Sequence, residues 1–160
     1  MKLLIQTIIV VIINISILSA KEVENNSNLL DLIVYKTPSC GCCNEWLSHI
    51  KANDIKTETN NYKNISPIKA KYAIKREYQS CHTAVNKDGY VFEGHIPAKY
   101  IKQFISEKHP NAIGLSVPGM PIGSPGMEVA SRFNPYKILL LLKDGTSEVY
   151  AEIKRFEDQY

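Results

Sequence analysis

A short strand, a tight cluster of cysteines and a helix are predicted to follow one another directly in this chain. Residues Leu32 to Lys36 are β-forming and end at the turn-forming tripeptide Thr37-Pro38-Ser39. Cys40-Gly41-Cys42-Cys43 comes next, and from Cys43 to Ile50 apolar residues recur at helical spacing. The sequence therefore predicts a helix that begins at the cysteines and ends near Asn53, so that the thiols lie at its N-terminus.

Strands and helices continue to alternate after this motif. Residues 55–59 alternate between apolar and polar side chains and predict a short strand. Ser66-Pro67 is a favourable helix start, with Ser66 as the N-cap and Pro67 in the first turn. Further along, Pro97 opens a third helix, which carries Ile105 on its apolar face and ends at His109-Pro110.

A β-hairpin is predicted in the middle of the chain. His82–Asn86 and Tyr90–Gly94 are β-rich and flank Lys87-Asp88-Gly89, and Asp-Gly is a strong hairpin signal. A two-residue turn at Asp88-Gly89 places Thr83 opposite Gly94 and His82 opposite His95.

A second hairpin is predicted near the end of the chain. Asp144-Gly145 joins Glu148–Ile153 to Ile138–Leu142, an apolar run typical of a strand that is buried on both faces. Before it, residues 114–127 hold three prolines and four glycines and predict a long irregular loop. Loops of this length are usually functional or disordered.

This order of elements predicts an α/β fold built around a central sheet. A strand that leads into a cysteine motif at the start of a helix is typical of thioredoxin-like proteins. On that interpretation residues 77–112 are an inserted hairpin–helix segment, and a β-hairpin completes the domain at the C-terminus. The pattern leaves open which of the two hairpins joins the central sheet.

The first thirty residues differ in character from the rest. Lys2 precedes a run that is almost continuously apolar to Leu18, and Ser19-Ala20 closes it with small residues, as in a secretory signal peptide. We therefore expect a signal peptide at 1–20, a polar linker at 21–30 and one domain at 31–160. An uncleaved membrane anchor is the alternative, because about 20 apolar residues span a bilayer.

Composition argues against two classes of protein. Hydrophobic residues make up 44% of the chain, which is enough for a core and excludes wholesale disorder. The net charge of +3 is spread along the chain, whereas a nucleic-acid-binding surface needs clustered Lys and Arg. We therefore expect no nucleic-acid partner.

All four cysteines lie beyond the predicted signal peptide. Exported proteins meet an oxidising compartment, where thiols form disulfides unless a metal or a reductant protects them. Cys40 and Cys43 make a C-x-x-C pair that suffices for disulfide exchange. Cys42 between them makes several pairings compete, and a direct Cys42–Cys43 bond needs strained geometry. Three thiols in one turn are better suited to holding a metal, and the helix N-terminus favours their thiolate form.

The spacing of the cysteines bears on which metal is bound. Soft thiolates select Cu(I), zinc or iron–sulfur clusters. Structural zinc sites usually combine two separated C-x-x-C pairs, whereas here three cysteines cluster and the fourth, Cys81, lies far along the chain. This spacing favours copper. Zinc, disulfide chemistry at Cys40 and Cys43, and a disulfide from Cys81 to one of the other three remain alternatives.

Histidines and methionines supply candidate auxiliary ligands. The predicted register brings His82 and His95 side by side next to Cys81, where they would bind the metal or support its ligands. The alternative is one surface histidine and one core histidine. Met120 and Met127 carry thioethers that suit Cu(I), although packing of the loop against the core is favoured for them. Outside this group, we assign His49 and His109 to the surface and Trp46 to the core.

Four separated strings resemble one known family. They are VYKTPSCGCCNEWLSHI (34–50), SCHTAV (80–85), EGHIPA (93–98) and GLSVPGMPIGSPGME (114–128). Together they resemble the CopG-type proteins of bacterial copper resistance, in the same order and over about residues 31–153.

The resemblance implies a periplasmic location, a thioredoxin-like fold and a copper–thiolate cluster on four cysteines. Those cysteines correspond to Cys40, Cys42, Cys43 and Cys81 of this chain. It also implies redox activity that interconverts Cu(I) and Cu(II) or couples copper to thiol oxidation, and other periplasmic copper-handling proteins as partners.

Overall fold

The computed structural model describes residues 30–160, so the predicted signal peptide and residues 21–29 of the predicted linker lie outside it. The strands are β1 (Leu32–Lys36), β2 (Thr57–Asn61), β3 (Thr83–Asn86), β4 (Val91–Glu93), β5 (Ala112–Ser116), β6 (Tyr136–Leu142) and β7 (Ser147–Ile153). The helices are α2 (Gly41–Ala52), α3 (Ser66–Lys71) and α4 (Ala98–Ser106), with 3₁₀ turns η1 (Arg76–Tyr78) and η2 (Phe156–Gln159). Within residues 30–160 no helix is long and apolar enough to span a bilayer.

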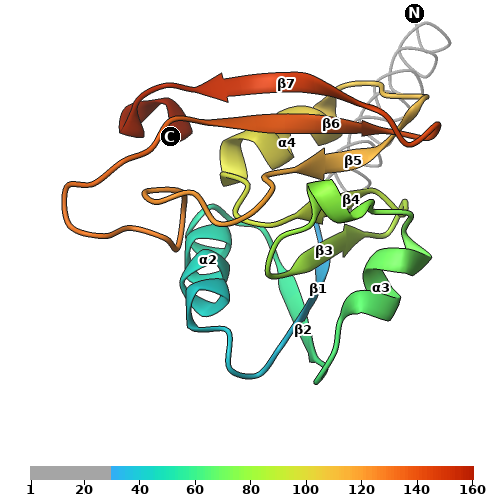
Figure 1. Ribbon diagram of the computed structural model, residues 1–160, viewed down its shortest axis with the longest axis horizontal. Helices are drawn as coiled ribbons and strands as arrows, with labels where there is room; N and C mark the ends of the chain where they lie inside the picture. Colours follow the sequence, from blue (N-terminus) through green and yellow to red (C-terminus); the bar gives the residue numbers. More distant parts are fainter. Residues whose placement is uncertain (1–29) are drawn as a thin grey trace, which may run out of the picture.

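One mixed sheet of seven strands organises the described part of the chain, in the order β2-β1-β3-β4-β5-β6-β7 (Figure 1). The pairs β1–β2 and β4–β5 are parallel. All other neighbouring pairs are antiparallel. The fold is therefore mixed α/β, as predicted, around a mostly antiparallel sheet.

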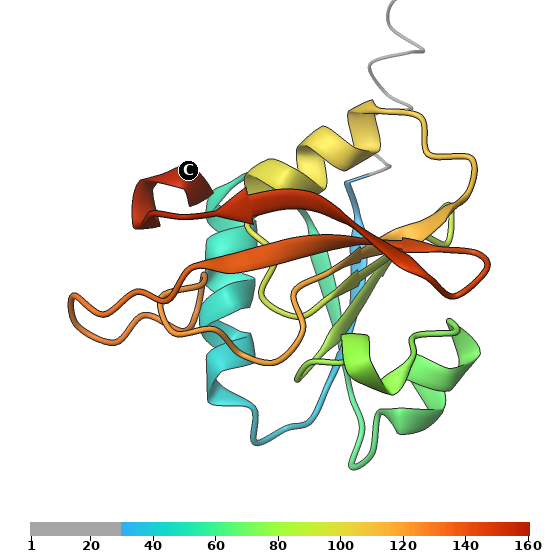
Figure 2. The ribbon, with the colours of Figure 1, turned by 45° about the horizontal axis from the view of Figure 1, so that its top comes forward.

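Apolar side chains cover both faces of this sheet. Helices α2 and α4 contribute to the larger cluster, with Trp46 and Phe104 packed against strand residues such as Phe92. A smaller cluster on the other face includes Val85 and Val91, near α3 and η1. Both ribbon views show α2 and α3 on opposite sides of β1 and β3 (Figures 1 and 2). Because side chains alternate along a strand, neighbouring residues of β3 and β4 face α2 and α3 in turn.

The strand–cysteine–helix motif is confirmed. Strand β1 has the predicted bounds, and α2 begins at Gly41 and is followed by Asn53 at its C-cap. The side chains that α2 buries are Cys43, Trp46, Leu47 and Ile50, the face that the helical spacing predicts. The predicted helix after Pro97 is also confirmed as α4.

Two local boundaries differ from the prediction. Strand β2 begins two residues later than predicted and runs to Asn61. Ser66 is the first residue of α3, not its N-cap, which is Ile65. The Ser66 N–H is instead bound by the Asn64 side chain, whose Oδ1 accepts it at 2.9 Å.

The register of the central hairpin is also different. Thr83 pairs with Glu93, where the sequence predicts Gly94, so residues 87–89 form a three-residue loop. His82 consequently lies opposite Gly94, whose N–H donates to the His82 carbonyl at 3.0 Å. Gly94 has a φ of +78°, a left-handed conformation that bends the chain beyond the strand and brings His95 back beside His82.

The position of that hairpin in the sheet corrects the predicted topology. The sequence predicts that residues 77–112 are an insertion, yet β3 pairs with β1 and β4 pairs with β5. These strands therefore stand in the middle of the sheet. Both hairpins join the same sheet, with β6 and β7 at its far end.

The long loop begins later than predicted, because residues 112–116 form strand β5. The irregular segment runs from Val117 to Pro135 and lies beside α2 in both ribbon views (Figures 1 and 2). Strand β6 is not buried on both faces, since Leu139, Leu140 and Leu142 are partly exposed. Neither face of β6 is fully covered: Ile138 is buried beside the partly exposed Leu140 and Leu142 on one face, and Leu141 is buried beside the partly exposed Leu139 on the other.

Candidate metal centre

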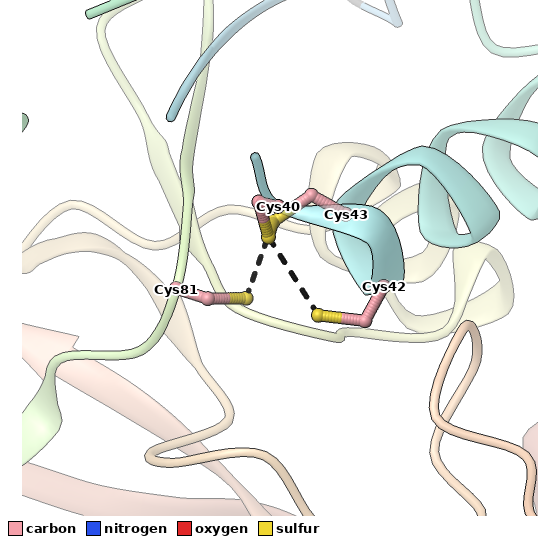
Figure 3. Close-up of side chains that lie close together, drawn as sticks. All are labelled: Cys40, Cys42, Cys43 and Cys81. Carbon is pink, nitrogen blue, oxygen red and sulfur yellow. Dashed lines mark hydrogen bonds between the residues drawn. A yellow bond between two sulfur atoms is a disulfide. The ribbon is translucent and has the colours of Figure 1, made fainter. Parts of the chain in front are cut away.

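Three of the four cysteines are placed by the start of α2. Cys40 is the N-cap residue, and Cys42 and Cys43 lie in the first turn. Cys81 comes from the segment between η1 and β3. The four Sγ atoms all lie within 4.8 Å of one another (Figure 3). The structure therefore brings together the four sulfurs that the sequence singles out.

The site consists of one disulfide with a free cysteine close to each of its two sulfurs. A disulfide joins Cys40 to Cys43, and Cys42 and Cys81 are free. The Cys42 Sγ lies 3.6 Å from the Cys40 Sγ, and the Cys81 Sγ lies 3.4 Å from the Cys43 Sγ. Cys81 thus reaches the C-x-x-C pair without bonding to it, and the alternative of a disulfide to Cys81 is not the pairing in this structure.

Hydrogen bonds with the end of β5 and the segment after it hold the chain next to Cys81. The Ser116 hydroxyl donates to the Tyr78 carbonyl at 2.6 Å, and the Gly119 N–H donates to the Gln79 carbonyl at 3.2 Å. The Ser80 hydroxyl donates in turn to the Gly119 carbonyl. The segment that carries Cys81 is therefore anchored residue by residue, although it belongs to no helix or strand.

The Cys81 thiol also contacts the imidazole of His95. Its Nδ1 lies 2.7 Å from the Pro125 carbonyl, which can only accept, so we assign the ring proton to Nδ1. Nε2 then carries a lone pair and lies 3.0 Å from the Cys81 Sγ. Burial lowers the pKa of His95, although the Pro125 carbonyl opposes this. The neutral imidazole accepts a hydrogen bond from the Cys81 thiol.

His82 is fully buried between Cys81 and the core. Its Nδ1 lies 3.4 Å from the Cys81 Sγ, and its ring centroid lies 4.2 Å from that of Trp46 and 5.2 Å from that of His95. Burial above all, and then the neighbouring His95 and Lys69, lowers the pKa of His82 well below its ordinary value. Its Nε2 has no hydrogen-bond partner among the described residues. The predicted proximity of the two histidines is confirmed, although the predicted register is wrong.

Cys81 is a thiol rather than a thiolate in this state. Burial raises its pKa to about 12, and the nearby Cys42 adds to this effect. The lowered thiol pKa values predicted for the helix N-terminus therefore do not extend to Cys81. Since a metal binds the thiolate, metal binding at Cys81 must release its proton.

The long loop forms one wall of the site. A Cβ at Gly126 would lie 2.5 Å from the Trp46 N and 2.7 Å from the Cys42 carbonyl oxygen, so the loop backbone rests directly on the cysteine turn. Of the two loop methionines, Met127 is partly buried and Met120 is 51% exposed. The prediction that the methionine side chains pack the loop against the core is therefore wrong for Met120.

The remaining predicted residues have defined partners. Trp46 is buried, as predicted, and its Nε1 donates to the Ile96 carbonyl at 2.9 Å. His49 and His109 are partly buried rather than on the open surface. His49 Nε2 accepts the Ala98 N–H at 3.0 Å, which holds α2 against the start of α4, and the His109 ring stacks on Phe104.

Sequence reasoning missed two features near the cysteines. The Pro125 carbonyl, which orients His95, has no signal in the sequence because any residue supplies a carbonyl. The buried pair Lys69 and Glu93 is also missed, because charged residues are normally assigned to the surface.

The donor set suits a soft metal ion. Four sulfur atoms within 4.8 Å of one another match the ligand preference of Cu(I) and zinc. Cys81, His82 and His95 form a second group of converging donors that shares Cys81 with the first. The disulfide must be reduced before all four sulfurs are available, because only thiolates bind the metal strongly.

Comparisons with known proteins agree with this site. A family profile described as "Protein of unknown function, DUF411" matches residues 78–127, which include Cys81. No protein with a curated sequence description matches the chain. Two solved structures, "Copper resistance protein copG- Form 1" and "Form 2", each superpose with a TM-score of 0.72 and 36% identity.

The likeness to these structures is not confined to the cysteine motif. It covers 77% of this chain and 96% and 97% of the two solved chains. Identity of 36% over that length is enough to place two chains in one family, and the four converging cysteines are consistent with it. The chain belongs to the CopG family of copper resistance proteins.

Proposed function

We propose that this is a periplasmic copper-binding protein that holds Cu(I) on the thiolates of Cys40, Cys42, Cys43 and Cys81. The observation that carries the proposal is the convergence of four sulfurs within 4.8 Å from two distant parts of the chain. Soft thiolates favour Cu(I) among the metals available to such a site. The copper resistance named for the two similar structures supports the same metal.

Export is the second part of the proposal. The N-terminal pattern at residues 1–20 is typical of a cleaved signal peptide. In the periplasm the free thiols would be oxidised unless a metal or a reductant protected them. A thiolate-bound copper cluster supplies that protection, and other periplasmic copper-handling proteins are its expected partners.

The fold is proposed to be thioredoxin-like with an addition at its C-terminus. The strand order β2-β1-β3-β4 with helices α2, α3 and α4 in sequence supports this, and the cysteine motif follows β1 as it does in thioredoxins. Strands β5, β6 and β7 then form the addition, together with the loop that rests on the cysteine turn.

Redox activity follows from having a disulfide inside the ligand set. Two thiolates that form a disulfide give up two electrons, which reduce two Cu(II) ions to Cu(I); the reverse reaction oxidises two Cu(I) ions. The disulfide between Cys40 and Cys43, with Cys42 and Cys81 free beside it, supports a site that alternates between a disulfide state and a metal-bound state.

A competition titration tests the proposal. The protein is reduced under anaerobic conditions and titrated with Cu(I) against a chromophoric chelator, beside Cys81→Ser and the control Ser39→Ala. Ser39 is exposed and next to Cys40 but supplies no sulfur. We expect Cys81→Ser to bind less copper, and to bind it about 10- to 100-fold more weakly, while Ser39→Ala matches the wild type. Equal copper content and affinity for Cys81→Ser and wild type would contradict the four-cysteine site, and retention of zinc against excess Cu(I) would indicate a zinc domain.

Thiol–disulfide exchange is the second candidate function. The specific observation in its favour is the C-x-x-C disulfide at the N-terminus of α2, with Cys81 3.4 Å from Cys43. A thiolate at Cys81 could attack the Cys43 sulfur, form a Cys43–Cys81 disulfide and release Cys40 as a thiolate. No net oxidation occurs in that step.

A further inference from the structure

A buried ion pair lies close to the segment that carries Cys81. Lys69 in α3 and Glu93 in β4 are 4% and 0% exposed, and the Lys69 Nζ donates to the Glu93 Oε1. The buried Thr83 hydroxyl accepts a second hydrogen bond from Lys69 at 3.1 Å and donates to the Glu93 Oε2 at 2.6 Å. Every charged group of this cluster is therefore hydrogen-bonded.

Stability alone does not explain such a pair. Removing two charges from water is costly, and apolar residues of similar size often serve a core equally well. Burial raises the pKa of Glu93. The positive charge of Lys69 and the hydrogen bonds that the carboxylate accepts from Lys69, Thr83 and Ser80 oppose that shift. A group kept at this cost is a candidate for a specific role.

Glu93 makes one contact that leads to the sulfur cluster. Its Oε1 also accepts the backbone N–H of Ser80 at 2.6 Å, and Ser80 directly precedes Cys81. Glu93 and Thr83 are paired residues on adjacent strands, and they face α3. Three of the four cysteines lie at the start of α2, and α2 is on the opposite side of β1 and β3 from α3 (Figure 1). The Ser80 N–H therefore connects the ion pair on one side to Cys81 on the other.

Cys81 needs such an anchor more than the other three cysteines do. Cys42 and Cys43 are fixed by the helical hydrogen bonds of α2, and Cys40 is its N-cap. Cys81 lies outside every helix and strand. Its position depends on the bonds made by the residues beside it, of which the bond from Ser80 to Glu93 is the one that ends on a buried charge.

We propose that Glu93 is a positioning residue that holds Cys81 within reach of the other three sulfurs through the Ser80 N–H. Lys69 and Thr83 fix the Glu93 carboxylate, so α3 is linked to the metal centre. This inference rests on the proposed copper function, because it assigns Glu93 a role at that site.

A matched pair of double variants tests the role without leaving a buried charge unpaired. Lys69→Met with Glu93→Gln removes both charges but keeps a side-chain oxygen that accepts the Ser80 N–H. Lys69→Met with Glu93→Leu removes both charges and the acceptor as well. Both are made in the full chain, with Cys81 intact and again with Cys81→Ser. Anaerobic Cu(I) affinity and the urea unfolding midpoint of the copper-free protein are measured for all four.

With Cys81 intact, we expect the Leu variant to bind Cu(I) about 10- to 100-fold more weakly than the Gln variant, as is typical when support for a ligand is lost. With Cys81→Ser, the two should bind equally, because the residue that Glu93 positions no longer supplies a sulfur. A simple structural role would instead shift the unfolding midpoint and affect copper binding alike in both backgrounds.

Two results would overturn the inference. One is equal affinity of the Leu and Gln variants with Cys81 intact, and the other is the same ratio of affinities in both backgrounds. If the Leu variant fails to fold, the same hydrogen bond can be removed from its donor side. Ser80→Pro lacks the backbone N–H that Glu93 accepts, and Ser80→Ala, which keeps it, is the control. Gln79, with φ −76° and ψ 148°, tolerates a following proline. Weaker binding by the proline variant alone then supports the inference, and equal binding overturns it. A wild-type protein that binds no Cu(I) would contradict the proposed function itself.

Discussion

The Sγ atoms of Cys43 and Cys81 lie 3.4 Å apart, although Cys81 comes 38 positions after Cys43 in the chain. Cys43 is fixed in the first turn of α2. The residues just before Cys81 are held by contacts from β4, the end of β5 and the segment after β5. The site is therefore assembled by the tertiary fold, and a change that loosens either part should separate the sulfurs without altering the C-x-x-C pair.

Copper should suppress thiol–disulfide exchange. We expect the copper-loaded protein to reduce insulin disulfides at least about tenfold more slowly than the reduced, copper-free protein, because bound thiolates cannot attack a disulfide. The double variant Cys40→Ser with Cys43→Ser serves as the control, since it removes both cysteines of the C-x-x-C pair, and with Cys43 the partner of Cys81, and should be inactive with or without copper. Equal rates for loaded and copper-free wild type, retained in Cys42→Ser, would favour an oxidoreductase instead.

Gly126→Ala should lift the long loop from the cysteine turn. Gly126 has a φ of +83°, and its new Cβ would meet the backbone of Trp46 at 2.5 Å. Gly89→Ala is the matched control, because Gly89 has a φ of +85° and nothing within 4 Å of the added Cβ.

The two glycine variants share the backbone cost of a positive φ, about 1–2 kcal/mol. Gly126→Ala should lower the free energy of unfolding by about a further 1–3 kcal/mol through the clash. Urea unfolding of the copper-free protein measures both values. A Gly126→Ala loss no larger than that of Gly89→Ala would show that the loop does not pack on the turn as described.

His49 should make stability depend on pH. Burial lowers its pKa, although the Glu128 carboxylate opposes this, and its Nε2 must be unprotonated to accept the Ala98 N–H. A histidine with a lowered folded-state pKa contributes stability above its unfolded pKa of about 6.5, and that stability is lost as the pH falls below it.

The measurement is a series of urea unfolding curves between pH 7.5 and pH 5 in copper-free protein. His49→Gln keeps an oxygen that can accept the Ala98 N–H but does not titrate. We expect the free energy of unfolding to fall more steeply with decreasing pH in the wild type than in His49→Gln. Parallel curves would show that protonation of His49 does not weaken the link between α2 and α4.

Local pattern was sufficient to predict the part of the fold that holds three cysteines. The β-forming run before Thr37 and the helical spacing of Cys43, Trp46 and Ile50 depend only on neighbours in the chain, and both elements have the predicted positions. The hairpin register could not be read in the same way. Asn86 Oδ1 accepts the N–H groups of Asp88 and Tyr90, at 3.1 and 2.9 Å, and these bonds stabilise the three-residue loop over the two-residue turn.

Other features of the fold depend on contacts between distant parts of the chain, and local sequence patterns do not predict them. Residues 112–116 appear irregular because Gly114 opens a Pro/Gly-rich stretch, yet they form a strand between β4 and β6. His82 and His95 meet because Gly94 bends the chain, not because they are paired across the hairpin. The burial of Lys69 and Glu93 depends on the docking of α3 over β3 and β4, which no local pattern specifies.

The central claim is that all four sulfurs bind copper together, and counting protected thiols tests it most directly. Anaerobically reduced protein, with and without stoichiometric Cu(I), is treated with an alkylating reagent, and each cysteine is assigned by mass spectrometry. We predict that Cys40, Cys42, Cys43 and Cys81 all react in the copper-free protein and become protected together as copper is added. Alkylation of Cys81 at an undiminished rate in the loaded protein, while the other three are protected, would contradict the account.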